Sequence, residues 1–228
     1  MATPPLHESI ARRHTQKVLR DPSIRTPLTP AQQQQLDSAL EAMLAAAQHA
    51  PYHKAAHAPL HCQGALTSRV PWRVYLIAQP TCWQLIDLIA ARATAEPAST
   101  WARAQGSKIP SLLAAAAAVV QVNWCPTPDD DAAVSLNTAN CEHIAASAAA
   151  VQNMLLTATD AGVANYWSTG GILREPTLQA ALGMEPDGQP LASVFLSFPL
   201  EGDTVKPGAM RDVKGEISDW ARTVTLDT

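Results

Sequence analysis

The strongest constraint on the fold is a long helical segment, rich in alanine, that leads directly into a strand. Residues Asn137–Ala161 contain no proline or glycine, and apolar side chains recur along one stripe of the predicted helix. Gly162 suits the left-handed conformation in which many helices end, and Val163–Ser168 has the composition of a strand. Small side chains on this helix let a neighbouring helix approach closely. The segment therefore predicts a domain in which helices cover a sheet.

The rest of the chain alternates between helical and strand-like segments. One helix has a clear start, because Thr29 can cap it, Pro30 suits its first position and Gln32 can complete a capping box, and Pro51 limits its end. The other predicted helices are Glu8–Val18, Thr81–Thr94, Ile109–Ala116 and Glu175–Leu182, the other predicted strands are Trp72–Ile77, Ala117–Val122 and Leu191–Phe198, and the predicted irregular segments are Tyr52–Val70 and the polar tail after Pro199. We expect an α+β fold with a small mixed sheet covered by helices. The sequence contains neither GxGxxG nor a P-loop, so any nucleotide is held in another way.

The composition argues against several classes of protein. With 16 Lys and Arg against 20 Asp and Glu, the net charge is −4, which does not suit a dedicated nucleic-acid binder. No apolar run approaches the ~18 residues of a membrane span, and Met1–Glu8 carries no signal-peptide pattern. The four cysteines are Cys62, Cys82, Cys125 and Cys141; they show no CxxC spacing and suit reduced thiols. We therefore expect a single cytoplasmic domain that spans residues 1–228.

Four parts of the sequence, taken together, resemble the FMN-dependent nitroreductase family. They are Arg12–Lys17 (RRHTQK); Ala47–Pro51 (AQHAP) with Pro71–Ile77 (PWRVYLI); Gln152–Leu156 (QNMLL) with Gly162–Trp167 (GVANYW); and Leu191–Pro199 (LASVFLSFP). They occur in the family's order and cover almost the whole chain. The resemblance implies a dimeric nitroreductase-like fold that binds FMN. It also implies a ping-pong reaction, in which NADH or NADPH reduces the flavin and the flavin reduces a nitroaromatic, a quinone or a similar small-molecule acceptor.

The resemblance also implies which residues bind the cofactor. The FMN phosphate carries nearly two negative charges and suits arginine, so Arg12, Arg13 and the C-terminal Arg211 are assigned to it. Without the family frame, Arg12 and Arg13 would be interpreted as a solvated basic helix face. The other residues that the resemblance places at the flavin are His14, Gln16, Pro51, Tyr52, His53, Lys108, Trp167, Ser168, Thr169, Gly170 and Gly171. No side chain is assigned as catalytic, because the flavin carries the redox chemistry.

The homodimer follows from the same resemblance. In the family the sites lie at the subunit interface, and the tail beyond Pro199 often wraps the partner. Much of the hydrophobic fraction of 47% is alanine, while only 5% of the residues are aromatic. We therefore predict that Asn137–Ala161 packs closely at the dimer interface, where a second subunit completes part of the core.

The sequence departs from the family pattern at three places. Tyr52-His53-Lys54 replaces small or hydroxyl residues, Ala55–Val70 contains an insertion, and Thr169 stands where many members have a glutamate. The insertion is expected to reshape the substrate pocket. These departures leave open a flavin-binding protein of the same fold without reductase turnover. A specialised flavin oxidase or dehalogenase on this fold also stays open, because it would differ only in the shape of the pocket.

A histidine ladder provides a competing hypothesis. His49, His53, His57 and His61 recur every four residues and would share one face of an unbroken helix, where they could bind Zn²⁺. Pro51 and Pro59 interrupt such a helix. We therefore favour surface or pocket histidines over a metal site.

Overall fold

The computed structural model describes residues 6–56, 66–127, 134–210, 213 and 215–224. Its centre is a four-stranded sheet in the order β2-β3-β5-β4, formed by Trp72–Ala78, Ala116–Trp124, Gln189–Ser197 and Ala164–Ser168. The prediction of a small sheet is confirmed, but its three pairings are all antiparallel, so the described sheet is not mixed. A separate antiparallel pair joins β1 (Gln16–Leu19) to β6 (Thr204–Pro207).

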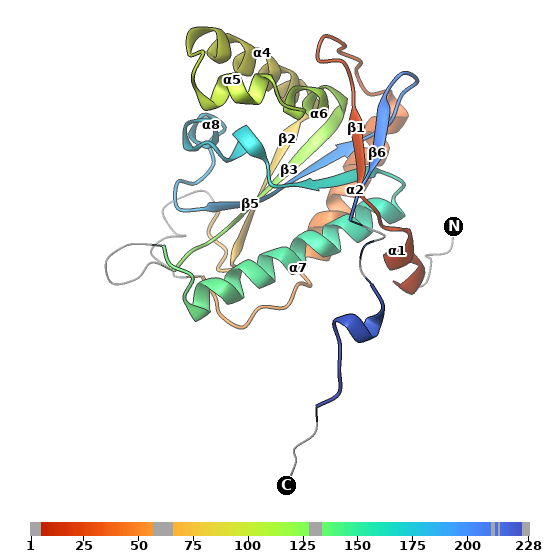
Figure 1. The fold of residues 1–228 in the computed structure, drawn as a ribbon, viewed down its shortest axis with the longest axis vertical. Coiled ribbons are helices and arrows are strands. Elements are labelled where there is room, and N and C mark those ends of the chain that lie inside the picture. Colours follow the sequence, from red (N-terminus) through yellow and green to blue (C-terminus); the bar gives the residue numbers. More distant parts are fainter. Residues whose placement is uncertain (1–5, 57–65, 128–133, 211–212, 214, 225–228) are drawn as a thin grey trace.

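Helices cover both faces of this sheet, as Figure 1 shows. One face carries α2 (Pro30–Ala47) and α7 (Thr138–Asp160), which share an apolar core with the strands. The opposite face carries α4 (Gln79–Ala95), α5 (Thr100–Gln105), α6 (Ile109–Ala115), the 3₁₀ turn η1 (Gly171–Arg174) and α8 (Pro176–Ala181). The short elements α1 (Leu6–Arg12) and η2 (Ile217–Asp219) lie near the two ends of the chain. No described helix is long and apolar enough to cross a bilayer.

Strand β3 shows how one segment serves both layers. All of its residues are buried. Because side chains alternate across a strand, Val120 and Val122 pack in the α2–α7 core, and Val119 packs in the core on the other face. The apolar run from Ala116 to Val120 is therefore expected of a central strand, and the buried polar residues Gln121 and Asn123 follow within the same strand.

The two long helices that were predicted from local signals are confirmed. Thr29 caps α2: its Oγ1 accepts from the Gln32 N–H at 3.2 Å, and the Gln32 side chain accepts from the Thr29 N–H at 3.0 Å. Asn137 caps α7 by accepting from the Asn140 N–H at 2.9 Å. Gly162 follows α7 with φ +71°, which relieves the strain that a side chain would add.

The predicted helix Glu8–Val18 is wrong over its second half. Helix α1 ends at Arg12, and Gln16–Leu19 is the strand β1. The reason is a partner far along the chain, because β1 pairs with Thr204–Pro207 and buries Val18 to 2% exposure. The prediction that the whole tail is irregular is also wrong, since residues 204–207 form β6.

Candidate functional site

Two segments bring cationic side chains to the edge of the sheet that β4 forms. The Lys17 ammonium on β1 lies 5.2 Å from the centre of the Tyr166 ring on β4. The ammonium of Lys108, just before α6, lies 5.4 Å from the same ring and donates to the Tyr166 hydroxyl at 3.3 Å. Neither ammonium forms an ion pair within the described part of the chain. This edge therefore has positive charge available for an anionic or electron-rich ligand.

A ring contact with the neighbouring strand holds Tyr166 in place. Its ring stacks on Phe195 of β5 with the ring centres 6.2 Å apart. The family resemblance places Lys108 at the flavin, but it assigns no role to Lys17 or Tyr166. Only the pairing of β1 and its position beside β4 reveal that Lys17 and Tyr166 face each other, so no local signal in the sequence could have found them.

The basic N-terminal stretch reaches the same edge. The Arg12 Nη2 donates to Asp160, the last residue of α7, at 2.8 Å, and the Ser9 hydroxyl donates to the other carboxylate oxygen at 2.9 Å. His14 donates through Nδ1 to the Arg12 carbonyl at 2.8 Å. These contacts tie α1 to the end of α7. They place the predicted residues Arg12, Arg13, His14 and Gln16 at the start of β1, although one edge of the Arg12 guanidinium is already engaged.

The predicted segment 167–171 forms a tight turn at the end of β4. Ser168 accepts from the Gly170 N–H through Oγ at 3.1 Å. Gly170 has φ +100° and Gly171 has φ +54°, conformations that favour glycine. A Cβ on Gly171 would lie 3.3 Å from Ile109, the residue after Lys108, so this turn lies against the start of α6. Thr169 is exposed, and Trp167 packs against the α2–α7 core.

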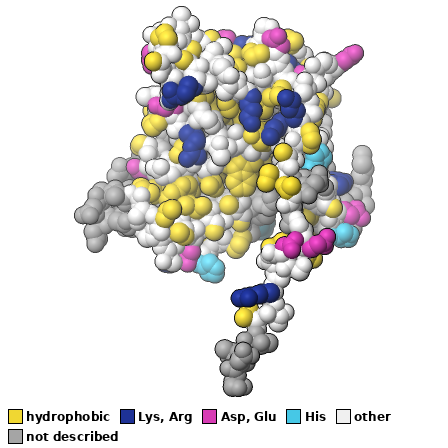
Figure 2. Space-filling view, viewed as in Figure 1, with side chains coloured by type: hydrophobic (Ala, Val, Ile, Leu, Met, Phe, Trp, Pro, Cys, Tyr) yellow, Lys and Arg dark blue, Asp and Glu magenta, His cyan; other side chains and the backbone are white. Residues whose placement is uncertain are grey.

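A cavity of about 260 Å³ adjoins this turn. The residues that line it come from α5, the loop before α6, η1 and Glu175: Thr100, Arg103, Ala104, Ser107, Ile109, Gly171, Ile172 and Glu175. Figure 2 shows the face of the molecule that is seen in Figure 1. Basic side chains gather over its upper part, and hydrophobic side chains lie over α7.

The remaining predicted residues lie at the opposite edge of the sheet. Pro51, Tyr52 and His53 are exposed after α2, and Tyr52 makes an edge-to-face contact with Trp72 of β2 at 5.7 Å between ring centres. Because β3 and β5 separate β2 from β4, the two groups stand about 14 Å or more apart. The structure therefore gathers one group of predicted residues and keeps the other group away from it within a single chain.

Some predicted residues lie outside the described part of the chain: Arg211, His57, His61 and Cys62. His49 and His53 are exposed, and no three His, Cys, Asp or Glu side chains among the described residues are grouped as metal ligands. The described cysteines, Cys82, Cys125 and Cys141, are all free thiols. Burial raises the pKa of Cys82 to about 12 and that of Cys125 to about 11, so these two are poor nucleophiles.

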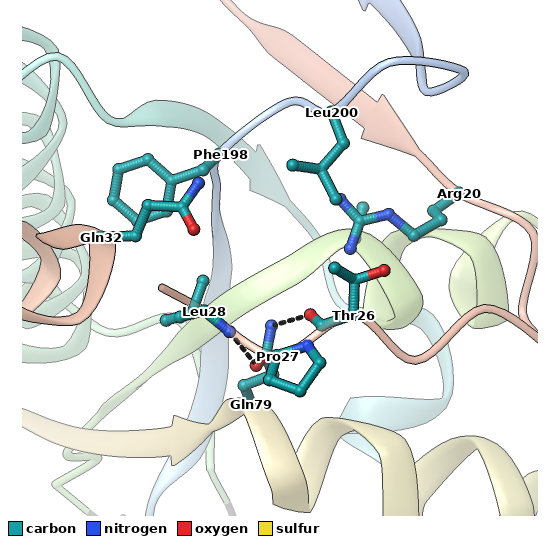
Figure 3. A pocket seen from close by; sticks show the side chains of 9 residues that line it. Arg20, Thr26, Pro27, Leu28, Gln32, Gln79, Phe198 and Leu200 are labelled. Carbon is teal, nitrogen blue, oxygen red and sulfur yellow. Dashed lines mark hydrogen bonds between the residues drawn. The ribbon is translucent and has the colours of Figure 1, made fainter. Parts of the chain in front are cut away.

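A second, much smaller cavity shown in Figure 3 is a structural feature rather than a ligand site. It measures about 10 Å³, lies beside Arg20 and holds no more than one water molecule. The buried Gln79 amide accepts from the Leu28 N–H and donates to the Thr26 carbonyl here. Arg20 turns to Asp203 with two bonds of 2.9 and 2.8 Å. Burial opposes the charge on Asp203, but the bonds from Arg20 and the Leu200 N–H outweigh it and lower the pKa of this carboxyl.

The residues at the β4 edge fit FMN. Its phosphate would meet the basic start of β1, and the lysines flank an aromatic face beside the turn. The two glycines let the turn pack closely on Ser193 and Ile109, which places its backbone at this edge. This fit concerns charge and hydrogen bonding only. It requires no side chain to act as a nucleophile.

Comparison with solved structures identifies the fold. A nitroreductase-like family protein from Bacillus cereus superposes with a TM-score of 0.64 and 19% identity, covering 98% of both chains. A nitroreductase with bound FMN from Bacteroides fragilis gives 0.57 and 19%, covering 94% of this chain and 99% of that one. Nitroreductase CinD from Lactococcus lactis in complex with chloramphenicol gives 0.60 and 12%, covering 97% and 100%. No protein-family model and no curated protein sequence matches. The chain therefore has the nitroreductase-like α+β fold.

Proposed function

We propose that this protein is an FMN-dependent oxidoreductase. The observation that carries the proposal is the convergence at the β4 edge: the start of β1, Lys108 and the 167–171 turn meet where a nitroreductase-like fold is expected to hold its flavin. Solved proteins of this fold contain FMN, including the one from Bacteroides fragilis. When bound, FMN would supply the hydride chemistry.

The residues of this chain then have separate roles. Arg12 and Arg13, together with Arg211, hold the phosphate, and His14 and Gln16 contact the ribityl chain or the pyrimidine ring. Lys17 and Lys108 bring positive charge to the ring edge and favour a reduced, anionic ligand over a neutral one. As the first residue of a helical turn, Gly171 has an N–H with no acceptor inside that turn, so it is available to a ligand. Ser168, Thr169 and Gly170 shape the same turn.

We further propose that NADH or NADPH is the electron donor and that a small aromatic acceptor such as a nitroaromatic or a quinone is reduced. Donor and acceptor would use the same open face in turn. The 260 Å³ cavity beside Gly171 extends that face, and Arg103 at its rim would favour a ligand with an anionic group.

The working unit in this proposal is a homodimer. Pro51, Tyr52 and His53 lie across the sheet from the β4 edge, so in a two-fold dimer they would reach the flavin of the second copy. Large apolar side chains of the tail also lack a cover in the single chain: Met210, Val213, Ile217, Trp220 and Val224 are each at least 65% exposed. Figure 1 shows the η2 segment standing away from the body, as expected for an arm that packs on a partner.

The decisive experiment is an absorption spectrum of the purified protein, with and without added FMN, before and after anaerobic NADPH. We expect a bound flavin spectrum that bleaches with NADPH or NADH. A flavin spectrum that neither donor bleaches would favour a flavin-binding protein without reductase turnover. No binding of added FMN at all would overturn the proposal.

A further inference from the structure

A line of uncharged polar side chains runs through the core beneath the turn at residues 168–171. Ser193 on β5, Gln121 and Asn123 on β3, and Gln179 on α8 are each at most 7% exposed. They lie among apolar residues, where buried polar groups are costly unless they are hydrogen-bonded. Each of these four is hydrogen-bonded to the next.

The hydrogen bonds all run in one direction. The Ser193 hydroxyl donates to Gln121 Oε1 at 2.5 Å, and Gln121 Nε2 donates to Asn123 Oδ1 at 2.9 Å. Asn123 Nδ2 donates to Gln179 Oε1 at 3.1 Å, and Gln179 Nε2 donates to the Leu173 carbonyl at 3.0 Å. Each amide therefore accepts at its oxygen and donates at its nitrogen. A chain with one consistent direction is cooperative and fixes the orientation of every member.

Both ends of this chain meet the same short segment. At one end, a Cβ on Gly170 would come within 2.6 Å of Ser193 Oγ, so the turn rests directly on that hydroxyl. At the other end, the Leu173 carbonyl belongs to η1, which begins one residue after Gly170. The hydrogen-bond chain thus contacts the segment at both ends, through Ser193 on β5 and through Gln179 on α8.

We propose that Ser193, Gln121, Asn123 and Gln179 are positioning residues for the turn that contacts the flavin. This inference rests on the proposed FMN function. The four side chains do not touch the ligand. They hold the backbone N–H groups of the turn in one position relative to the sheet. A hydrogen bond to a redox-active ring changes the stability of its oxidised and reduced forms unequally, so the turn position sets the potential of the bound cofactor.

The test compares single variants at the two ends of the chain with a matched control. Ser193→Ala removes the first donor, and Gln179→Met removes the last one. Ser197→Ala is the control, because Ser197 lies on the same strand and the same face as Ser193 and is 3% exposed. Ser197 is not a member of the hydrogen-bond chain. Two quantities are measured: hydrogen–deuterium exchange of the 168–173 amides in FMN-free protein, and the midpoint potential of bound FMN.

We expect both chain variants to raise amide exchange in the turn and to shift the midpoint potential by about 30 mV, a tenfold change in the relative affinity for oxidised and reduced FMN. The Ser197→Ala control should leave both unchanged. Wild-type exchange and potential in both chain variants would overturn the positioning role alone. Failure of the wild-type protein to bind FMN would overturn the proposed function and this role with it.

Discussion

Gly170 is the residue at which the turn tolerates least change. Its φ of +100° lies outside the range that L side chains favour, and its α-carbon faces Ser193 Oγ at a distance that leaves no room for a methyl group. Gly183 offers a comparison, since its φ is +70° but a Cβ there would meet nothing within 4 Å. Comparing alanine substitutions at Gly170 and Gly183 separates the free-energy cost of a positive φ from the cost of the contact with Ser193.

We predict that Gly170→Ala lowers the free energy of unfolding by about 1–3 kcal/mol more than Gly183→Ala does, because only the first substitution forces a core contact to shift. Urea denaturation of the two FMN-free variants measures the difference. Equal losses would show that Ser193 moves away without cost and that the turn is not held rigidly.

Asp203 contributes to stability through an ion pair that is almost wholly buried. The Arg20 and Asp203 side chains are 4% and 3% exposed and joined by two hydrogen bonds. Asp203→Asn leaves the Arg20 charge without its counter-charge, so we predict a loss of about 3–5 kcal/mol at neutral pH. The control is Asp87→Asn, whose exposed pair with Arg25 should be worth about 1 kcal/mol or less. Denaturation at pH 7 compares the two variants.

The same pair gives a pH dependence with a defined sign. The pKa of Asp203 is lowered in the folded state, so its contribution is complete above the unfolded value of about 3.9 and is lost as the pH falls through the folded value. The stability difference between wild type and Asp203→Asn should be constant from about pH 5 to 7 and shrink below pH 4. A difference that stays constant down to pH 2 would contradict this assignment.

At the scale of elements, the sequence predicts those that carry their own signals. Thr29 and Gln32 specify the start of α2, and Asn137 and Gly162 bracket α7, because each cap is a local hydrogen bond or a local backbone conformation. Strand β1 is different. Its four residues show no strand period, and they are extended because residues 204–207 pair with them from the far end of the chain.

The candidate site follows the same division. The basic stretch and the glycine turn can be found in the sequence, since each is a short motif. The contact between Lys17 and Tyr166 depends on how β1 lies beside β4. The hydrogen-bond chain from Ser193 to Gln179 depends on the register of β3 and β5. Neither register nor strand order is written in a local pattern, so tertiary structure was needed to reveal both.

Helix α7 provides a test of the proposed dimer. Its outer face carries half-exposed small residues, among them Ala148, which would allow a second copy to approach closely. We predict that Ala148→Trp weakens the dimer, because a large ring holds the helices apart. The control is Ala42→Trp on the exposed face of α2. Light scattering after size-exclusion chromatography measures the mass, and a stable FMN-bound Ala148→Trp dimer would show that α7 is not the interface.

At the scale of the whole molecule, the tail is expected to act on a partner. Deleting residues 208–228 keeps the β1–β6 pair but removes the exposed side chains of Ile217 and Trp220. We predict that the truncated protein folds, yet dissociates at concentrations at which the full chain stays dimeric, because burial of large apolar side chains drives association. Sedimentation velocity over a dilution series measures this. Unchanged dissociation would assign the tail another role.

The separation of the predicted flavin residues across the sheet makes the sharpest prediction for the assembly. If Arg13 serves one flavin and His53 serves the flavin of the second copy, then Arg13→Glu and His53→Asp damage different halves of each site. Each variant alone should lose FMN-dependent activity. Mixed dimers formed by co-expression would carry one site with both defects and one site with neither. Random pairing makes half of the dimers mixed, so about a quarter of all sites should be intact.

Activity of the co-expressed pair should therefore approach about a quarter of wild type, whereas a mixture of separately purified variants that do not exchange subunits should stay inactive. Differently tagged chains allow the mixed dimer to be isolated and its FMN content counted. If the isolated mixed dimer is as inactive as either parent, both halves of the site belong to the same chain. The distance imposed by β3 and β5 between the two groups argues against that outcome, because a single flavin at the β4 edge would have to reach across the sheet.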